Sequence, residues 1–352
     1  MDDPKRENLW TSGPQRRQEG EATVHRIVRI HKTGGPEVLT IEDLKDTPPA
    51  ANEISIRVKA LGLNRSESMF RSGRHIESAK FPARLGYEAA GTVCAMGRDV
   101  SGFAIGDAVS IIPPPSVTRW GAYGEVATVP FEFVVKHPDS LSWIQAAAVW
   151  MQSVTAYGTL IDIARIREGD SVIILAASSS VGLAAIQIAN SVGAISIATT
   201  RTNAKKQALL DFGAKHVIAT ETEDLCARVN EITDGRGARI VLDPIGGPGI
   251  VTLVNAMAPQ GILISYGMLS QEPTPYPLFT MVAKCLTLRG FTFKEIVSDP
   301  ERLARAKQFI LENLAAGRLL PIIDKTFAFD QIVDAHRYLE SNQQFGKIVV
   351  TV

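Results

Sequence analysis

The sequence has little of what marks several classes of protein. Its 352 residues include only three cysteines, Cys94, Cys226 and Cys285, which lie far apart in the chain. Neither a disulfide framework nor a Cys-x-x-Cys metal site is therefore expected, and a reducing cytoplasm is the expected compartment. No apolar run approaches the roughly 18 residues that a membrane-spanning helix needs, so no membrane association is expected.

Net charge is also missing, because 37 Lys and Arg residues balance 37 Asp and Glu residues. This balance gives no overall attraction to nucleic acid, and we expect no nucleic-acid partner. The length exceeds the size at which a single hydrophobic core usually stops growing, so two domains are expected. Residues 1–24 mix acidic and basic side chains with Pro and Gly and lack an apolar segment, which predicts a disordered leader.

The rest of the chain shows two different patterns of apolar residues and turns. Residues 27–135 contain short alternating apolar runs separated by Gly and Pro turns, which predicts a compact and mostly antiparallel β domain. After about residue 143, buried apolar runs alternate with helical patterns, which predicts βαβ units and a parallel sheet. The strands expected in this second part cover residues 171–176, 195–199, 216–218, 239–242, 261–265, 286–290 and, near the C-terminus, 347–350. The expected helices cover residues 144–163, 181–192, 204–212, 224–232, 249–256, 301–316 and 331–339.

A turn of small residues follows the first of these strands, and a helix is expected to begin directly after it. A dinucleotide fingerprint reads Gly-x-Gly-x-x-Gly at such a turn, and this chain has Ala177, Ser179 and Gly182 in the three Gly positions. Small side chains let backbone amides approach a pyrophosphate, although such a turn also occurs for packing alone. We predict that the turn binds cofactor phosphates through Ala177, Ser178, Ser179, Ser180, Val181 and Gly182.

The second strand leads into Thr200, Arg201 and Lys205. The acidic residue that would bind the ribose hydroxyls of NAD is missing there, whereas hydroxyl and cationic groups suit a 2′-phosphate. The alternative is an ordinary solvated helix start, but cations at that place oppose the helix dipole unless an anion is bound. NADPH is therefore the expected cofactor, with these three residues as phosphate ligands.

Together with further short motifs, these segments resemble the medium-chain dehydrogenase/reductase superfamily and, within it, the zinc-free quinone oxidoreductase (zeta-crystallin-like) branch. The resemblance runs from about Val28 to Val352, and the order and spacing of the pieces are more specific than any single piece. The matching pieces are residues 34–39, 62–67, 70–73, 82–88, 91–93, 106–109, 121–125, 155–157, 243–247 and 345–350.

The resemblance implies an α/β architecture of two domains. A GroES-like, mostly β catalytic domain (25–146 and 291–352) would be interrupted by a Rossmann NADP-binding domain (147–290), and the C-terminal strand would return to the first domain. It also implies a homodimer, which could be joined edge to edge through strand 286–290.

The departures from zinc-using relatives concern the metal ligands. Those relatives have a Cys where this chain has Asn64 and a His where it has Tyr87. A catalytic zinc needs about three protein ligands, usually Cys and His, so we expect no metal. Glu88, which is retained, is expected to have a structural role or to lie behind the site. The six histidines are scattered, and each is expected to be a surface or core residue.

Without a Lewis acid, the substrate itself must accept hydride readily, as quinones and conjugated carbonyls do. The protein then needs to hold the cofactor against the electrophilic carbon and to donate hydrogen bonds to the developing oxyanion. By matching the family motifs, Asn64, Tyr87 and Tyr123 become the catalytic candidates, each with an ordinary turn or core role as the alternative. Near the nicotinamide or its phosphates we expect Thr155, Tyr266, Gly267, Phe291, Phe293 and Lys347, the two phenylalanines being equally plausible as core residues.

The leading hypothesis is thus an NADPH-dependent quinone reductase, with a reductase of α,β-unsaturated carbonyls as a close rival. A non-catalytic NADPH-binding module and a zinc alcohol dehydrogenase are further alternatives, because fold alone does not fix function. No Ser-His-Asp or Cys-His arrangement is evident, and the sequence does not choose the proton donor.

Overall fold

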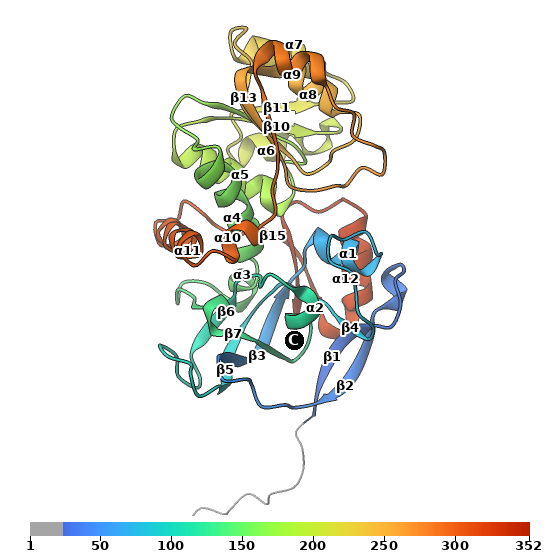
Figure 1. Cartoon of the computed structure of the whole chain (residues 1–352), viewed down its shortest axis with the longest axis vertical. Coiled ribbons are helices and arrows are strands. Elements are labelled where there is room, and N and C mark those ends of the chain that lie inside the picture. Colours follow the sequence, from blue (N-terminus) through green and yellow to red (C-terminus); the bar gives the residue numbers. More distant parts are fainter. Residues whose placement is uncertain (1–23) are drawn as a thin grey trace, which may run out of the picture.

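A computed structural model describes residues 24–352, which form two lobes (Figure 1). The upper lobe in Figure 1 is built on a parallel sheet, and the lower lobe is built on mostly antiparallel sheets. The predicted leader lies outside the described residues, apart from Val24, which begins strand β1 (Val24–Ile30).

The upper lobe contains one six-stranded parallel sheet with the order β11-β10-β9-β12-β13-β14. Its strands are β9 (Ser171–Ile174), β10 (Ile195–Thr200), β11 (His216–Ala219), β12 (Ala238–Asp243), β13 (Met257–Ser265) and β14 (Thr287–Gly290). All six match strands expected from the sequence. The chain order reverses at β9, and in such a doubly wound sheet the reversal marks the crevice where dinucleotides bind.

Helices connect these strands and cover both faces of the sheet. They are α5 (Ser180–Ser191), α6 (Lys206–Asp211) after a 3₁₀ turn (Asn203–Lys205), α7 (Leu225–Ile232), α8 (Ile250–Ala256) and α9 (Leu278–Lys284). The sequence did not predict α9, where only a loop and a strand were expected. None of its residues is buried, so no amphipathic pattern marks it.

The lower lobe contains a seven-stranded sheet, in the order β15-β16-β3-β5-β6-β8 with β7 beside β3, and a three-stranded sheet in the order β2-β1-β4. The remaining strands are β2 (Thr40–Lys45), β3 (Glu53–Gly62), β4 (Ala83–Arg84), β5 (Glu88–Met96), β6 (Ala108–Ile111), β7 (Val126–Pro130), β8 (Val134–Lys136), β15 (Ile323–Ala328) and β16 (Lys347–Thr351). The last strand, β16, pairs antiparallel with β3, and Val349 lies opposite Gly62. The predicted return of the C-terminus to the first domain is therefore confirmed.

Strand β15 was not expected, since the sequence predicted only a loop near Pro321. Its central residues Asp324, Lys325 and Thr326 are exposed and polar, so the segment has no apolar alternation. It forms a strand because it pairs in parallel with β16 at the edge of the sheet.

The other helices lie around the lower lobe and between the lobes. They are α1 (Arg65–Arg71), α2 (Val117–Trp120), α3 (Trp143–Ala146), α4 (Trp150–Tyr157) continued by a π-helix (Gly158–Ile163), α10 (Lys294–Val297), α11 (Pro300–Ala315) and α12 (Ile332–Glu340), with 3₁₀ turns at Pro36–Val38, Phe131–Phe133 and Phe329–Gln331. The helix predicted over 144–163 is thus interrupted between α3 and α4. The interruption lets the chain enter the upper lobe at α4.

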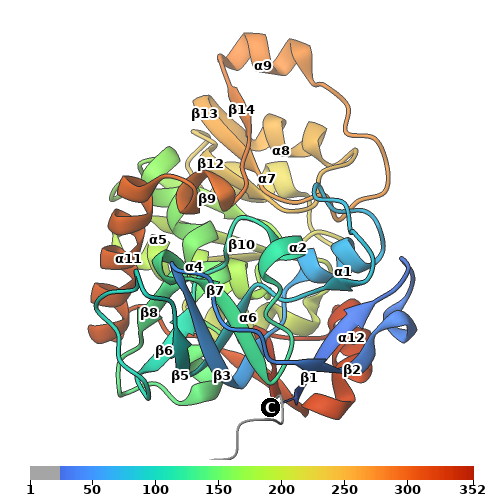
Figure 2. The same ribbon diagram turned by 60° about the horizontal axis from the view of Figure 1, so that its bottom comes forward.

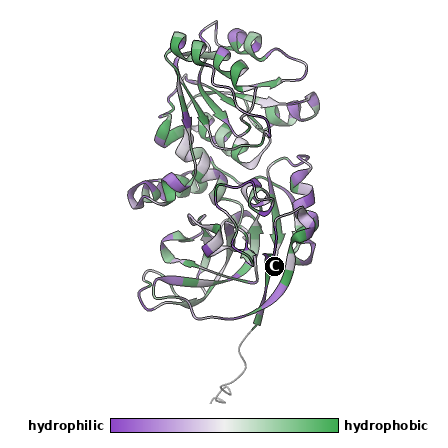
Figure 3. Cartoon of the chain, turned by 45° about the vertical axis from the view of Figure 1, so that its right-hand side comes forward, coloured by the Kyte–Doolittle hydropathy of each residue, from purple (hydrophilic) through white to green (hydrophobic). Residues whose placement is uncertain are grey.

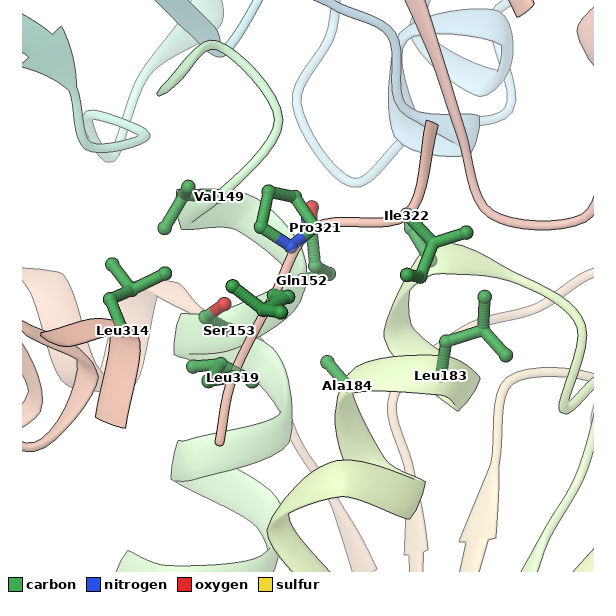
Figure 4. A pocket seen from close by; sticks show the side chains of 11 residues that line it. Val149, Gln152, Ser153, Leu183, Ala184, Leu314, Leu319, Pro321 and Ile322 are labelled. Atoms are coloured by element: carbon green, nitrogen blue, oxygen red, sulfur yellow. The ribbon is translucent and has the colours of Figure 1, made fainter. Parts of the chain in front are cut away.

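Tight packing joins the lobes beside α4. Figure 4 shows side chains of α4, of α5, of the end of α11 and of the segment that follows it converging on a small cavity. Its volume of about 10 Å³ corresponds to a single water molecule, so little free space remains there. Elsewhere, apolar residues are concentrated on the strands of both lobes (Figure 3).

Within residues 24–352, no helix combines the length and the apolar character that crossing a membrane requires.

Candidate cofactor and substrate cleft

A cleft of about 1850 Å³ is lined by residues of both lobes. One part of its wall comes from the carboxyl ends of the parallel strands and the N-terminus of α5, and another from α1 and the loop that follows it. The residues named from the sequence that line it are Asn64, Thr155, Ser178, Ser179, Ser180, Val181, Thr200, Arg201, Lys205, Tyr266, Gly267, Phe291 and Phe293. Of the others, Tyr87, Tyr123, Ala177, Gly182 and Lys347 are not on its wall.

The turn between β9 and α5 brings backbone amides to the cleft. Ala176 adopts a left-handed conformation (φ 47°), and the Ser179 hydroxyl accepts a hydrogen bond from the Gly182 N–H (3.1 Å) as the N-cap of α5. A Cβ atom on Gly182 would lie 2.5 Å from the Ala177 carbonyl oxygen, so glycine there permits close packing of helix and strand. The positive end of the α5 dipole therefore faces the cleft, which suits an anion.

Arg201 and Lys205 differ in whether their side-chain hydrogen-bond donors are free to bind a ligand. Arg201 is exposed, and its guanidinium has no hydrogen-bond partner among the described residues. The Lys205 ammonium donates to Ser178 Oγ (3.2 Å) and to the carbonyl oxygens of Asn342 (3.0 Å) and Gln344 (2.7 Å), and burial lowers its pKa. Arg201 is thus the available cation, while Lys205 ties the C-terminal segment to the phosphate turn.

That C-terminal segment lines the cleft, and the sequence indicated it only through the family position of Lys347, not through Asn342 or Gln344. The Gly346 N–H donates to the Ser178 carbonyl (2.9 Å), and Asn342 and Gln344 line the cleft. A contact over more than 160 residues of chain leaves no local pattern, so only the folded structure reveals it.

Two buried polar atoms of cleft residues, Tyr266 Oη and Gln344 Oε1, have no hydrogen-bond partner within residues 24–352. Burial and the nearby Asp243 raise the pKa of Tyr266, so its hydroxyl stays protonated and can donate. A buried donor and a buried acceptor without partners are costly unless a ligand satisfies them. These atoms, the α5 N-terminus and Arg201 fit a phosphorylated dinucleotide.

Asn64 lies on the wall, but its side chain is fully engaged. Its Nδ2 donates to the Gly62 carbonyl (3.3 Å), Glu67 (3.2 Å) and Glu88 (3.1 Å), and its Oδ1 accepts from Lys347 (2.7 Å). To donate to a substrate it would have to give up one of these bonds.

Behind Asn64, Glu88 and Lys347 form a fully buried ion pair. The Lys347 ammonium also donates to Gln152 (3.2 Å), and the second Glu88 oxygen accepts from the N–H groups of Trp150 (3.0 Å) and Met151 (3.1 Å) at the start of α4. Lys347 was expected near the cofactor phosphates, but the structure places it in this network. Glu88 lies behind the site, as the sequence suggested.

The two tyrosines expected to be catalytic are completely buried. Tyr123 donates to Glu67 (2.5 Å), whose pKa burial raises to about 7, and lies 3.3 Å from His336 Nε2. Tyr87 is separated from the cleft by two residues that line it, His75, whose Nε2 lies 3.3 Å from Tyr87 Oη, and Phe293, against which its ring packs. His75 itself lines the cleft, although only a surface or core role was expected for it from the sequence.

The described residues contain no cluster of three or more His, Cys, Asp and Glu side chains that could hold a metal ion.

Comparison with known proteins agrees with this geometry. Residues 50–139 match the alcohol dehydrogenase GroES-like domain, and residues 180–312 match the family described as zinc-binding dehydrogenase. A quinone oxidoreductase of Pseudomonas aeruginosa is 31% identical over 318 residues, which cover 90% of this chain and 96% of that protein. The chain belongs to the quinone oxidoreductase branch of the medium-chain dehydrogenase/reductase superfamily.

Two further proteins that are similar to this chain bear on its cofactor and its substrate. The crystal structure of an Escherichia coli quinone oxidoreductase complexed with NADPH superposes with a TM-score of 0.85 at 29% identity, covering 93% of this chain and all of that one. A 2-haloacrylate reductase of a Burkholderia species is 28% identical over 331 residues, which cover 91% of this chain and 97% of that protein. The predicted family and fold are confirmed, and the protein is an NAD(P)-dependent reductase.

Lys347→Met should destabilise the protein by about 3–5 kcal/mol, because it leaves the Glu88 carboxylate buried without its counter-charge. The double variant Lys347→Met/Glu88→Gln should recover much of the loss. Urea unfolding curves measure both, with exposed Lys59→Met as the matched control. A loss below about 1 kcal/mol in the single variant would contradict the role given to the pair.

Proposed function

We propose that this protein reduces a quinone with NADPH and that no metal ion takes part. The observation that carries the proposal is the continuity of the cleft, which joins the phosphate turn to an apolar end with Met69, Phe291 and Phe293. Such walls suit a flat, uncharged ring held against the nicotinamide. The replacement of zinc ligands by Asn64 and Tyr87 supports the metal-free part of the proposal.

Bound NADPH supplies a hydride, and the residues of the cleft supply position and hydrogen bonds. The amides of the turn before α5 and Arg201 hold its phosphates, and Arg201 favours the 2′-phosphorylated cofactor over NADH. Thr155, Tyr266 and Gly267 orient the nicotinamide end. Quinone carbons are already electrophilic, so orientation and charge stabilisation are sufficient to promote transfer.

Reduction of an α,β-unsaturated carbonyl compound is the second candidate. The 2-haloacrylate reductase relative is named for a conjugated substrate. The same apolar end of the cleft would accept a small enone, and the same hydride position serves both reactions.

The three cysteines are unpaired, which accords with a cytoplasmic enzyme.

The first test is NADPH oxidation with 1,4-benzoquinone and with a small enone, run alongside metal analysis of the purified protein. We expect turnover with at least the quinone and no stoichiometric zinc. Clear NADPH binding without turnover of either compound would favour a binding module, and stoichiometric zinc would overturn the metal-free reaction.

Arg201→Ala should weaken NADPH binding about 10- to 100-fold and leave NADH binding nearly unchanged, because a charged hydrogen bond to phosphate contributes roughly 1.5–3 kcal/mol. Titration of protein fluorescence with each nucleotide gives the two dissociation constants. Arg167→Ala, an exposed arginine away from the cleft, is the matched control. Equal losses for both nucleotides would refute the assignment of Arg201.

We also propose a homodimer joined through β14, the edge strand of the upper sheet. Its neighbour α9 stands out from the lobe (Figure 2), and around it Tyr276, Phe279 and Val282 are 68%, 87% and 68% exposed. An unpaired strand edge next to exposed apolar side chains is a typical surface for a second copy of the chain.

Light scattering should give the mass of a dimer at micromolar concentration. Phe279→Glu/Val282→Glu should give a monomer because it places charge in the apolar contact, whereas Ile105→Glu, a change at an exposed apolar residue of the other lobe, should remain dimeric. A wild-type monomer would refute the proposal.

A further inference from the structure

The proposed reduction needs a donor at the substrate oxygen, and the three sequence candidates are poorly placed for it. Asn64 is fully engaged, and Tyr87 and Tyr123 do not reach the cleft wall. His75 does line the cleft, in the loop between α1 and β4.

Aromatic neighbours hold the His75 ring at the apolar end of the cleft. The ring centroid lies 5.8 Å from that of Phe70 and 6.2 Å from that of Tyr87, and Tyr87 packs edge-on against Phe293 (5.4 Å). Phe293 lines the cleft as well. His75 is therefore next to the wall against which we place the substrate ring.

The hydrogen bonds of His75 define which nitrogen can donate. The Glu77 N–H donates to His75 Nδ1 (3.1 Å), so in the neutral ring the proton is on Nε2. That N–H has only the long contact of 3.3 Å to Tyr87 Oη. A ligand oxygen in the cleft can take the place of Tyr87 Oη as the acceptor of this N–H.

The loop that carries His75 is fixed from several sides by Glu77. The Glu77 carboxylate accepts from Ser116 Oγ (2.6 Å), Thr118 N (3.1 Å) and Lys294 Nζ (3.3 Å). Burial alone would raise its pKa, but these hydrogen bonds together outweigh burial and lower the pKa to about 2. Because Lys294 directly follows Phe293, its bond to Glu77 fixes the position of His75 relative to the apolar wall. A preorganised donor is what stabilisation of a developing oxyanion requires.

We propose that His75 is a catalytic residue of the reductase, whose Nε2–H donates to the substrate oxygen on which negative charge develops, and that Tyr87 is the positioning residue that aims the ring. The inference rests on the proposed function. Neutral histidine acts here as a hydrogen-bond donor, and the imidazolium can also transfer its proton.

The step balances as a two-electron reduction. The β-carbon of the conjugated substrate gains a hydride, with its electron pair, from the nicotinamide C4–H bond. The electrons of its C=C bond form a new double bond to the carbonyl carbon, and the carbonyl π electrons move to the oxygen. In the imidazolium, Nδ1 gives up the hydrogen bond from the Glu77 N–H and instead donates to the Glu77 carbonyl oxygen (3.4 Å). The Nε2–H bond breaks as the substrate O–H bond forms, and the proton on Nδ1 stays in place. The resulting enol tautomerises through water, and solvent returns the proton to His75.

The pH dependence follows from the groups that face the ring. These are Glu77 in its own loop, Lys294 from α10 and the Tyr87 hydroxyl; burial and Lys294 lower the pKa of His75 below 6.5. At neutral pH the ring is therefore uncharged. Turnover should rise as the pH falls through this pKa, because the cation is the stronger donor.

The test compares His75→Phe, His75→Gln and Tyr87→Phe with the wild type, and uses exposed His31→Gln as the control. We measure kcat and KM for 1,4-benzoquinone and a small enone from pH 5 to 8, and the dissociation constants of NADPH and, with NADP⁺ bound, of hydroquinone. His75→Phe should lower kcat about 10²- to 10³-fold, leave NADPH binding unchanged and weaken hydroquinone binding about fivefold.

The pH profile separates a catalytic role from a structural one. The rise in turnover at low pH should disappear in both His75 variants, whereas His75→Gln, whose amide still donates, should retain more activity at pH 8 than His75→Phe. Tyr87→Phe should keep the rise with a moderately lower kcat, and His31→Gln should match the wild type.

A His75→Phe or His75→Gln variant with wild-type turnover and an unchanged pH profile would overturn the role of His75 while leaving the proposed function intact. If His75→Phe fails to fold, the profile of His75→Gln decides. Absence of turnover in the wild type with either compound would instead overturn the proposed function, and this inference with it.

Discussion

The buried ion pair between Glu88 and Lys347 is the contact on which the arrangement of the two lobes depends. It joins β5, near the middle of the first domain, to β16, at the end of the chain, and the same carboxylate caps α4 at the entry to the second. Removing two charges from water is expensive, and the cost is recovered only where every donor and acceptor is satisfied. Asn64 and Gln152 complete that set. A side chain lost from this cluster therefore affects both the fold and the floor of the cleft.

The cleft itself divides its tasks between lobes. The upper lobe supplies the helix N-terminus, the free cation Arg201 and the strand ends, which are features of backbone topology. The lower lobe supplies α1 and the His75 loop, with the buried pairs Glu88–Lys347 and Tyr123–Glu67 behind them. In the proposed function, the upper lobe binds the dinucleotide and the lower lobe determines which acceptor is reduced.

Local patterns were sufficient to predict most of the fold. Six parallel strands and the small-residue turn have strong periodic or compositional signals, and all were found. Strand β15 and helix α9 were missed, because an exposed edge strand and a helix without a buried face lack such signals. In the site, the tyrosines at motif positions lie behind the wall, whereas His75, Asn342 and Gln344 line it. Their roles arise from contacts between distant segments, which one sequence without structure does not disclose.

The tie between the phosphate turn and the segment around Gly346 has a consequence for movement between the lobes. Ser178 and Lys205 of the upper lobe bond to the backbone of Asn342, Gln344 and Gly346, in the segment that leads into β16 of the lower lobe. A hinge movement at this end of the cleft would have to break these hydrogen bonds. The phosphate turn and the lower lobe are therefore expected to move as one rigid body, and any widening of the cleft is expected away from them.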